Sequence, residues 1–118
     1  ICTDDLEWVQ SQNVFNDDKF VVSETRLYYD TAVMIGGGSY DHSLVPYYDL
    51  CLMSLCNGGI IANSSLSWWG AWLQNNRGKI VAPSPWYGPT HTELKDDDLV
   101  PDRWTKIYND PTPIPIEE

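Results

Sequence analysis

The sequence predicts an α/β fold in which a Rossmann-like parallel sheet is flanked by helices. Short apolar runs, typical of strands buried on both faces, alternate along the chain with longer helical segments. The connections between them are short, which favours parallel strands joined by helical crossovers. The chain has 118 residues, enough for one domain with its own hydrophobic core.

The charge of the chain excludes several functions. It has 17 acidic and 7 basic side chains, which give a formal net charge of −10. Binding to nucleic acid or to anionic membranes depends on many basic contacts, so we expect no nucleic-acid partner. A small nucleotide held by backbone N–H groups is compatible with this charge. With 42% hydrophobic and 13% aromatic residues, the chain is also too apolar to be disordered.

The cysteines and the first residues bear on location and completeness. Cys51 and Cys56 are expected in one helix, where their Cα atoms would lie about 8 to 9 Å apart, beyond the reach of a disulfide. Reduced thiols, together with the lack of a signal peptide or a long apolar run, favour a cytoplasmic location. The chain begins with Ile1 rather than methionine, and residues 1–5 have the pattern of a strand end entering a turn. We therefore expect it to be part of a longer protein.

The first elements follow from local patterns. Asp4 and Asp5 suit the cap and first turn of a helix at about residues 5–12, because the N-terminal end of a helix favours negative charge. Residues 20–23 form an apolar, β-branched run that predicts a buried strand. Residues 24–45 fit either a helix or a strand, until the glycines at 36–38 interrupt them.

The pattern is clearer from Pro46 onward, where a buried helix is expected over residues 47–56. A strand at 60–62, a polar turn at 63–65, a helix at 66–74 and a strand at 79–83 follow, the last stopped by its proline. Trp86 and Trp104 are expected to anchor the region beyond. Residues 1–108 would thus form the domain, and residues 109–118 an extended tail.

The turn between the strand at 60–62 and the next helix is the strongest candidate site. Ser64 and Ser65 open the helix, so their hydroxyls, the unpaired N–H groups and the helix dipole converge on one point. Such a point attracts an anion such as a diphosphate. Gly70 and Ala71 keep the next turn thin enough for another backbone or a ligand to approach. The alternative is an ordinary serine N-cap followed by tryptophans that fill the core.

Long motifs around this turn resemble a known family. Residues 49–56 (DLCLMSLC) and 60–73 (IIANSSLSWWGAWL) closely resemble a signature of the α-1,2-fucosyltransferases, glycosyltransferase family 11. Residues 3–8 (TDDLEW), 79–83 (KIVAP) with Trp86, and 101–104 (PDRW) match in family order. The resemblance covers about residues 1–107, and its central motif is rich in rare residues.

The resemblance implies a donor-binding domain like the C-terminal domain of a two-domain GT-B enzyme. Such an enzyme transfers fucose from GDP-fucose to the 2-hydroxyl of a galactose-containing glycan, without a cofactor or an obligatory metal. By similarity to the related α-1,6-fucosyltransferases, Ser64, Ser65 and Ser67 would hold the diphosphate. Asp49 would recognise guanine, because a carboxylate can accept both N1–H and N2–H of that base, a donor pair that adenine lacks.

Thr3, Asp4 and Asp5 would lie beyond the end of the first strand, on the rim that faces the donor. There they could contact the sugar or the ribose. An alternative role for Asp4 is to cap the helix that follows.

One family feature is missing. Members carry a His-x-Arg-x-Gly-Asp-like segment whose arginine neutralises the departing diphosphate, but neither His42 nor His91 has an arginine two residues later. We therefore assign no catalytic residue and expect little transferase activity from this chain alone. The competing hypothesis is a non-catalytic α/β interaction module, or a truncated product, that binds no nucleotide. In either case an exposed domain face would favour self-association.

Several other features are given structural roles. Residues 96–98 (DDD) contain an Asp-x-Asp pattern, but we interpret them as a solvated acidic loop rather than a metal site. Cys51 and Cys56 are expected in the helix core. Helical spacing would place at least two of Trp68, Trp69 and Trp72 on the interior face.

Overall fold

The computed structural model describes residues 1–23, 45–75, 77–88, 91 and 93–108. The chain divides into two compact units, Ile1–Leu52 and Met53–Glu118, each of which is described here by itself. The predictions for residues 24–44 and for the tail at 109–118 lie outside the described residues. Among the described residues, no helix is both long and apolar enough to span a bilayer.

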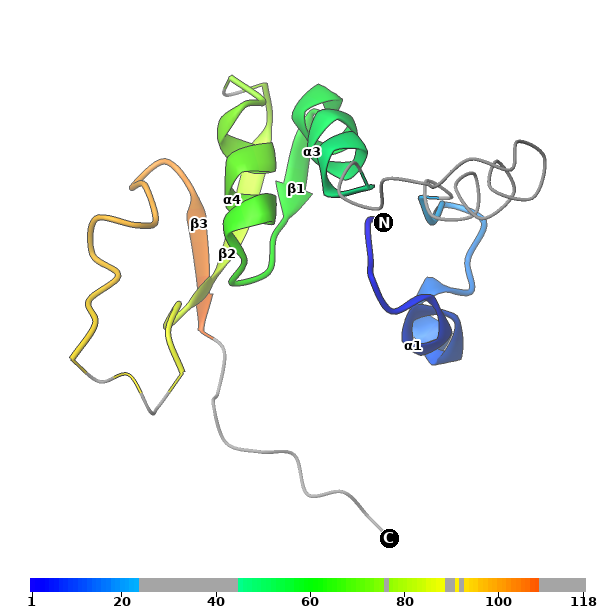
Figure 1. Ribbon diagram of the computed structural model, residues 1–118, viewed down its shortest axis with the longest axis horizontal. Helices are drawn as coiled ribbons and strands as arrows, with labels where there is room; N and C mark the ends of the chain where they lie inside the picture. Colours follow the sequence, from blue (N-terminus) through cyan, green and yellow to red (C-terminus); the bar gives the residue numbers. More distant parts are fainter. Residues whose placement is uncertain (24–44, 76, 89–90, 92, 109–118) are drawn as a thin grey trace, which may run out of the picture. The chain divides into compact units, whose positions relative to one another are not determined.

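The first unit begins with the helix α1 (Leu6–Ser11), close to the predicted bounds, and continues with the short 3₁₀ helix η1 (Asn13–Phe15) (Figure 1). Asp5 is the N-cap of α1, because its Oδ1 accepts a hydrogen bond from the backbone N–H of Trp8 at 2.9 Å. The alternative role of Asp4 as the cap is therefore wrong. A carboxylate three residues before an unpaired N–H has the geometry that capping requires, and Asp5 occupies that position.

The predicted buried strand at 20–23 is wrong. Residues 20–23 belong to no strand, and Val21 is 76% exposed rather than buried on both faces. The segment still pairs with the start of the chain: the nitrogen of Ile1 donates to the Val21 carbonyl at 2.6 Å, and Ser23 N–H donates to the Ile1 carbonyl at 2.7 Å. The two bonds lie on either side of Val22, which is the pattern found between neighbouring parallel strands. Here the pairing joins only Ile1 and Val22.

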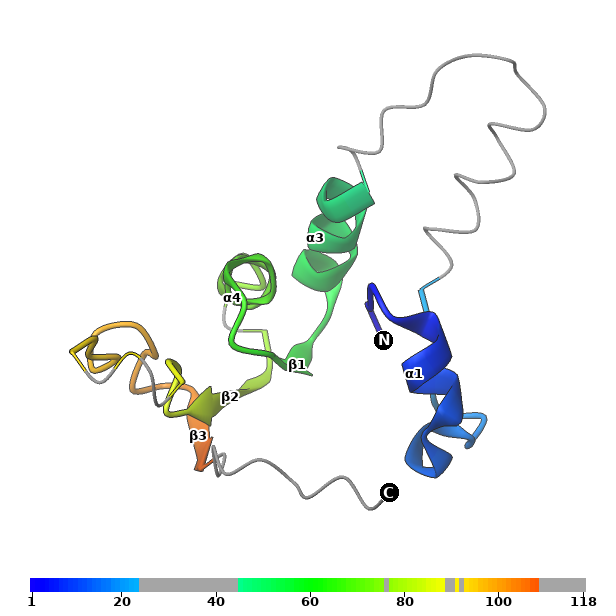
Figure 2. The same ribbon diagram turned by 60° about the horizontal axis from the view of Figure 1, so that its bottom comes forward.

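The second unit contains a three-stranded sheet that confirms the predicted fold class. The strands β1 (Gly58–Ile60), β2 (Lys79–Ser84) and β3 (Thr105–Tyr108) lie in the order β1-β2-β3, and both neighbouring pairs are parallel. The helix α4 (Ser65–Trp72) connects β1 to β2 and lies over one face of the sheet (Figures 1 and 2). A helix that connects two neighbouring parallel strands in this way is the crossover of a Rossmann-like α/β fold.

The strand bounds differ from the predicted ones in an informative way. β1 begins two residues before the predicted start, although Ile61 N–H still bonds to the Val81 carbonyl at 2.9 Å. Pro83 does not stop β2, because it pairs in register with Ile107 of β3. β1 pairs with β2 only as far as Val81, so on that side of β2 no strand needs the N–H that proline lacks. The sequence did not predict β3.

The core of the second unit lies between the sheet, α4 and the stretch between β2 and β3. Trp86 and Trp104 are 8% and 6% exposed, which confirms them as anchors. Gln74 is a buried polar residue that joins three segments: its Oε1 accepts from Gly58 N–H at 2.9 Å, and its Nε2 donates to the Met53 carbonyl at 2.9 Å. The buried hydrophobic residues of this cluster are Ile61, Ala71, Ile80, Ala82, Trp86, Val100 and Trp104.

The helix α3 (Val45–Leu55) has nearly the predicted bounds but not the predicted burial. Tyr47 is 64% and Leu55 68% exposed, and the side chains of Cys51 and Cys56 are exposed as well. The prediction of a buried helix with core cysteines is wrong. Apolar residues run around the whole helix, and only part of its circumference can pack against neighbouring elements. As predicted, the cysteines form no disulfide.

Candidate functional site

The turn between β1 and α4 presents two serines at the start of a helix. Ser64 is the N-cap, with extended backbone angles (φ −128°, ψ 136°), and its side chain makes no capping hydrogen bond. The helix begins with Trp68 N–H donating to the Ser64 carbonyl at 3.0 Å. Ser64 and Ser65 are both exposed. The first turn of α4 therefore offers hydroxyls and the positive end of the helix dipole to an anion, beyond the carboxyl end of a parallel strand.

Ser67 has a different position from the other two serines. It is half-buried, and its hydroxyl lies 3.0 Å from the Ala62 carbonyl and 3.1 Å from the Ser64 carbonyl. The hydroxyl proton is thus directed at the backbone on both sides of the turn. Ser67 fixes the conformation in which Ser64 and Ser65 are presented, a role that the sequence pattern did not separate from direct contact.

Asn63 ties this turn to the loop that follows β2. Its Nδ2 donates to the Trp86 carbonyl at 3.2 Å. Trp86 N–H in turn donates to Asp96 Oδ2 at 2.8 Å, so the turn, the Trp86 loop and Asp96 form one hydrogen-bonded chain. Because β1 and β2 are parallel, their following loops lie at the same edge of the sheet. The turn is therefore held by a second segment as well as by its own helix.

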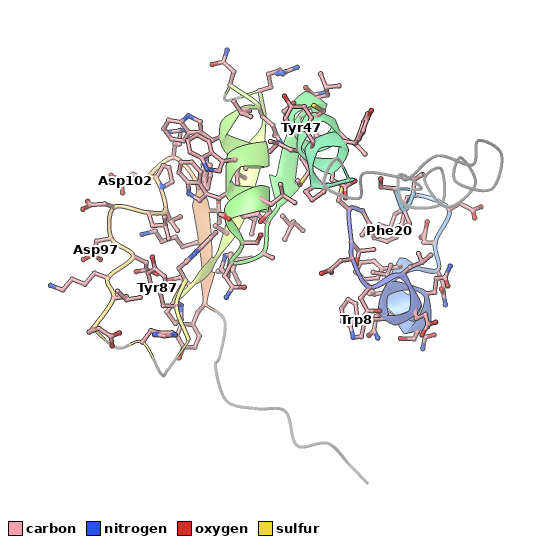
Figure 3. The ribbon with its side chains drawn as sticks, in the orientation of Figure 1. Trp8, Phe20, Tyr47, Tyr87, Asp97 and Asp102 are labelled. Atoms are coloured by element: carbon pink, nitrogen blue, oxygen red, sulfur yellow. The ribbon has the colours of Figure 1, made fainter. Side chains whose placement is uncertain are left out.

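The acidic run at 96–98 divides into two parts. Asp96 is half-buried and bonded to Trp86, whereas Asp97 and Asp98 are exposed, as a solvated loop requires. Figure 3 shows Tyr87, Asp97 and Asp102 along the stretch between β2 and β3. Within the described ranges, no group of three His, Cys, Asp or Glu side chains is placed to hold a metal ion.

The middle of α4 is approached closely, as its small residues predict. A Cβ atom added to Gly70 would lie 2.7 Å from Met53 Cβ, a separation that real Cβ atoms do not show. Gly70 and its neighbour Ala71 are both buried. The thin turn therefore accommodates the end of α3 rather than a ligand.

The arginines that the structure describes lie at the other end of α4. Arg77 donates from Nε to the Gln74 carbonyl at 2.9 Å and from Nη2 to the Ser54 carbonyl at 3.1 Å. The Arg103 guanidinium lies over the ring of Trp72, the last residue of α4, at 4.3 Å from the ring centre. Eight helical residues span about 12 Å, so neither cation lies at the serine turn.

The tryptophans of α4 are less buried than predicted. Trp68 packs against the core, and its Nε1 donates to the Leu99 carbonyl at 2.7 Å. Trp72 stacks on Trp68 at 5.1 Å between ring centres, yet it is 41% exposed, and Trp69 is 51% exposed. The prediction that at least two of the three face the interior is wrong. A short helix over a three-stranded sheet is covered on one side only, and the three tryptophans are spread over more of the helix surface than that side.

The remaining predicted site residues lie in the first unit. Asp49, on α3, is half-buried and accepts a hydrogen bond from Ser23 Oγ at 3.2 Å. Thr3 and Asp5 meet at the start of α1, where Thr3 Oγ1 accepts from Asp5 N–H at 3.0 Å. Asp4 is exposed beside them. Because the three serines belong to the second unit, the prediction that both groups share one site stays a prediction.

Comparison with known proteins identifies the family. The profile of glycosyl transferase family 11 matches residues 1–108. This chain belongs to glycosyltransferase family 11. The match includes both units and the whole β1–α4 turn, so the motifs that carry the resemblance also build the candidate site.

Two curated relatives from Escherichia coli are similar to this family 11 chain. An alpha-1,2-colitosyltransferase is 35% identical over 108 residues, which is 91% of this chain and 31% of that protein. The O-antigen biosynthesis glycosyltransferase WbnK is 33% identical over 99 residues, 82% of this chain and 32% of that protein. The chain thus spans about a third of the length of these relatives. No solved structure matches it significantly.

Sequence reasoning missed two residues that contact the candidate site and one that joins segments of the core. Asn63 and Ser23 form contacts across 23 and 26 positions of sequence, and Gln74 joins the core across 16. For Asn63, the available signal was its place as a polar residue directly beside a serine-rich turn. The sequences around Gln74 and Ser23 have no pattern that predicts their partners.

Proposed function

We propose that this chain is the donor-binding portion of an α-1,2-fucosyltransferase, and that the first turn of α4 holds the diphosphate of GDP-fucose. The observation that carries the proposal is the exposed N-cap Ser64, whose side chain makes no capping bond, followed by the exposed Ser65. A phosphate at this position would receive backbone N–H donors, two hydroxyls and the favourable end of the dipole. Family membership supports a glycosyltransferase, and the name of one relative specifies an α-1,2 transfer, of colitose rather than fucose. The choice of fucose therefore rests on the resemblance of the motifs.

Asp49 would recognise the guanine of the donor. Its carboxylate can accept N1–H and N2–H as a pair, and charge-assisted bonds of this kind are stronger than neutral ones. An adenine nucleotide presents an acceptor at N1 and would meet the carboxylate unfavourably. GDP is therefore expected to bind more tightly than ADP, while the diphosphate contacts are common to both.

The chain is expected to bind the donor more readily than it transfers the sugar. In the proposed reaction the 2-hydroxyl of a galactose residue attacks the anomeric carbon of fucose with inversion, and GDP departs. A departing diphosphate needs positive charge, yet the net charge is −10 and both described arginines are engaged at the far end of α4. The remaining two thirds of a full-length relative would have to supply the acceptor site and that charge. No metal is required for the donor contacts proposed here.

The first experiment measures binding of GDP and ADP to the 118-residue chain by calorimetry and by NMR shift mapping. Replacing both Ser64 and Ser65 by alanine should weaken the binding of GDP at least about fivefold, because each lost hydroxyl contact is worth about 0.5 to 1.5 kcal/mol. Ser11→Ala, an exposed serine on α1, is the matched control. Equal binding of GDP and ADP, or unchanged GDP binding in the double variant, would contradict the proposal.

A second experiment moves charge rather than hydroxyls. Ala62 is exposed immediately before the turn, and Ala62→Arg should strengthen GDP binding about two- to fivefold at an ionic strength of about 0.1 to 0.15 M, the usual range for an exposed ion pair. Leu73→Arg adds the same charge at the other end of α4, about 12 Å away and beyond the screening length of about 8 to 10 Å. It should leave GDP binding unchanged. Equal strengthening by both variants would show a non-specific charge effect and remove the turn as the diphosphate site.

A further inference from the structure

A hydroxyl of the first unit contacts the carboxylate that the proposed function assigns to guanine. Ser23 Oγ donates to Asp49 Oδ1 at 3.2 Å in a partly buried position. Ser23 precedes Asp49 by 26 positions, so this contact is a product of the fold rather than of a local turn. Both residues are half-buried.

The backbone at Ser23 is anchored independently of Asp49. Ser23 N–H donates to the Ile1 carbonyl at 2.7 Å, and the nitrogen of Ile1 donates to the Val21 carbonyl at 2.6 Å. The two bonds lie on either side of Val22 and hold the backbone of Ser23 against the first residue of the chain. With the backbone fixed, the short serine side chain has a single torsion to set, and its hydroxyl points at α3.

We propose that Ser23 is a positioning residue that orients the Asp49 carboxylate for paired recognition of guanine. This inference rests on the proposed role of Asp49. A paired contact needs both carboxylate oxygens in the plane of the base, and a bond to Oδ1 restrains rotation of the group about its side-chain torsions. An ionised carboxylate has about four acceptor positions, and the bond from Ser23 occupies one of them.

The restraint should affect selectivity more than affinity as a whole. Without Ser23 the carboxylate can still accept N1–H of guanine with one oxygen, but the second bond, to N2–H, requires the orientation that Ser23 sets. IDP is the decisive probe, because hypoxanthine has the same N1–H and lacks the exocyclic amino group. The ratio of IDP to GDP dissociation constants therefore reports the second bond alone.

The test measures that ratio by calorimetry for the 118-residue chain and four variants. The unaltered chain should prefer GDP over IDP by about tenfold or more, as expected for a hydrogen bond to a charged group. Ser23→Ala and Ser23→Val should reduce the preference at least about threefold, whereas Ser23→Thr, which has the shape of valine but keeps the hydroxyl, should retain it. Asp49→Asn should abolish the preference. The threonine and valine pair gives the answer even where the alanine variant does not fold.

Two results would overturn the inference, and they differ from each other. If Asp49→Asn abolishes the preference while Ser23→Val retains it, Asp49 reads guanine without help from Ser23. If Ser23→Val weakens the binding of GDP and of IDP by the same factor, Ser23 supports the fold rather than the orientation of the carboxylate. A chain that binds GDP and IDP equally, or whose preference survives Asp49→Asn, instead removes the proposed role of Asp49 and the inference with it.

Discussion

Replacing Gln74 by leucine should destabilise the second unit, because one side-chain amide holds two other segments in place. Gln74 is 3% exposed, and its amide joins the end of α4 to the start of β1 and to the end of α3. In the variant the Met53 carbonyl keeps a bond from Cys56 N–H at 3.2 Å, but Gly58 N–H loses the Oε1 partner that it has at 2.9 Å. This hydrogen bond is partly buried, and an N–H that is shielded from water and has no partner costs about 1 to 3 kcal/mol.

Adding the lost bonds of the amide itself, we expect Gln74→Leu to lower the free energy of unfolding by about 2 to 3 kcal/mol. For a unit of this size that corresponds to a fall of about 10 to 20 °C in the melting temperature. Thermal and urea unfolding followed by tryptophan fluorescence would measure both. Gln10→Leu, an exposed glutamine on α1, is the matched control and should change stability by less than about 0.5 kcal/mol. If the two variants are equally stable, Gln74 does not join these segments.

Three further outcomes are expected. Gly70→Ala should lower the free energy of unfolding by about 1 to 3 kcal/mol, and Met53→Ala should not relieve this loss, because the nearest atom is Met53 Cβ; urea unfolding of the double variant checks it. Ser67→Ala should weaken GDP binding and cost about 0.5 to 1.5 kcal/mol of stability, whereas Ser67→Thr should preserve both; retained binding in the alanine variant would contradict this. The pKa of Asp17 is held below 3.8, first by a hydrogen bond from the backbone N–H of Lys19 and then by one from its side chain. The stabilising contribution of Asp17 is therefore present above pH 3.8 and is lost as the pH falls through the lowered pKa. Carboxyl NMR titration should show that the pKa of Asp17 rises partly toward 3.8 in Lys19→Ala and does not change in Lys95→Ala.

The parallel sheet could be predicted because its inner parts have a clear pattern. Residues 79–83 are a compact apolar run, and the strand there, β2, is the central one, with a neighbour on each side. β3 gives no such signal, because Lys106, Ile107 and Tyr108 are exposed in this chain and their pattern does not show a buried face. Burial produces the sequence signal that strand prediction depends on, so a short edge strand with little burial is missed.

The same reasoning explains why the apolar helices were misjudged. An apolar composition, such as that of α3 or of the tryptophan-rich α4, shows that a helix has a face to cover but not how much of its surface is covered. Leu55 and Trp69, at 68% and 51% exposed, lie on the sides that their neighbours in this chain leave uncovered. Burial depends on the number of elements packed around a helix, which its own sequence does not contain.

The candidate site divides in the same way between local and long-range features. The presentation of Ser64 at a helix start follows from residues 60–68 alone, so a pattern of a strand, a polar turn and a helix was enough to find it. Its restraint by Asn63 through Trp86, and that of Asp49 by Ser23, join positions more than twenty residues apart. Local sequence therefore indicated which groups form the candidate site, whereas the residues that hold them appear only when distant segments are folded together.

The two ends of α4 show how this chain distributes its few positive charges. Carbonyl groups at the C-terminal end of a helix need donors, and Arg77 supplies them to both Gln74 and Ser54, while Arg103 stacks on Trp72 nearby. Neither described arginine lies at the N-terminal end, which presents the dipole, N–H groups and hydroxyls. Because these groups attract an anion without neutralising it fully, they suit reversible binding of a diphosphate better than expulsion of one as a leaving group. The division of charge along one short helix thus provides a physical reason to separate donor binding, which this chain is proposed to perform, from sugar transfer, for which we propose that further parts of a family 11 enzyme supply the positive charge.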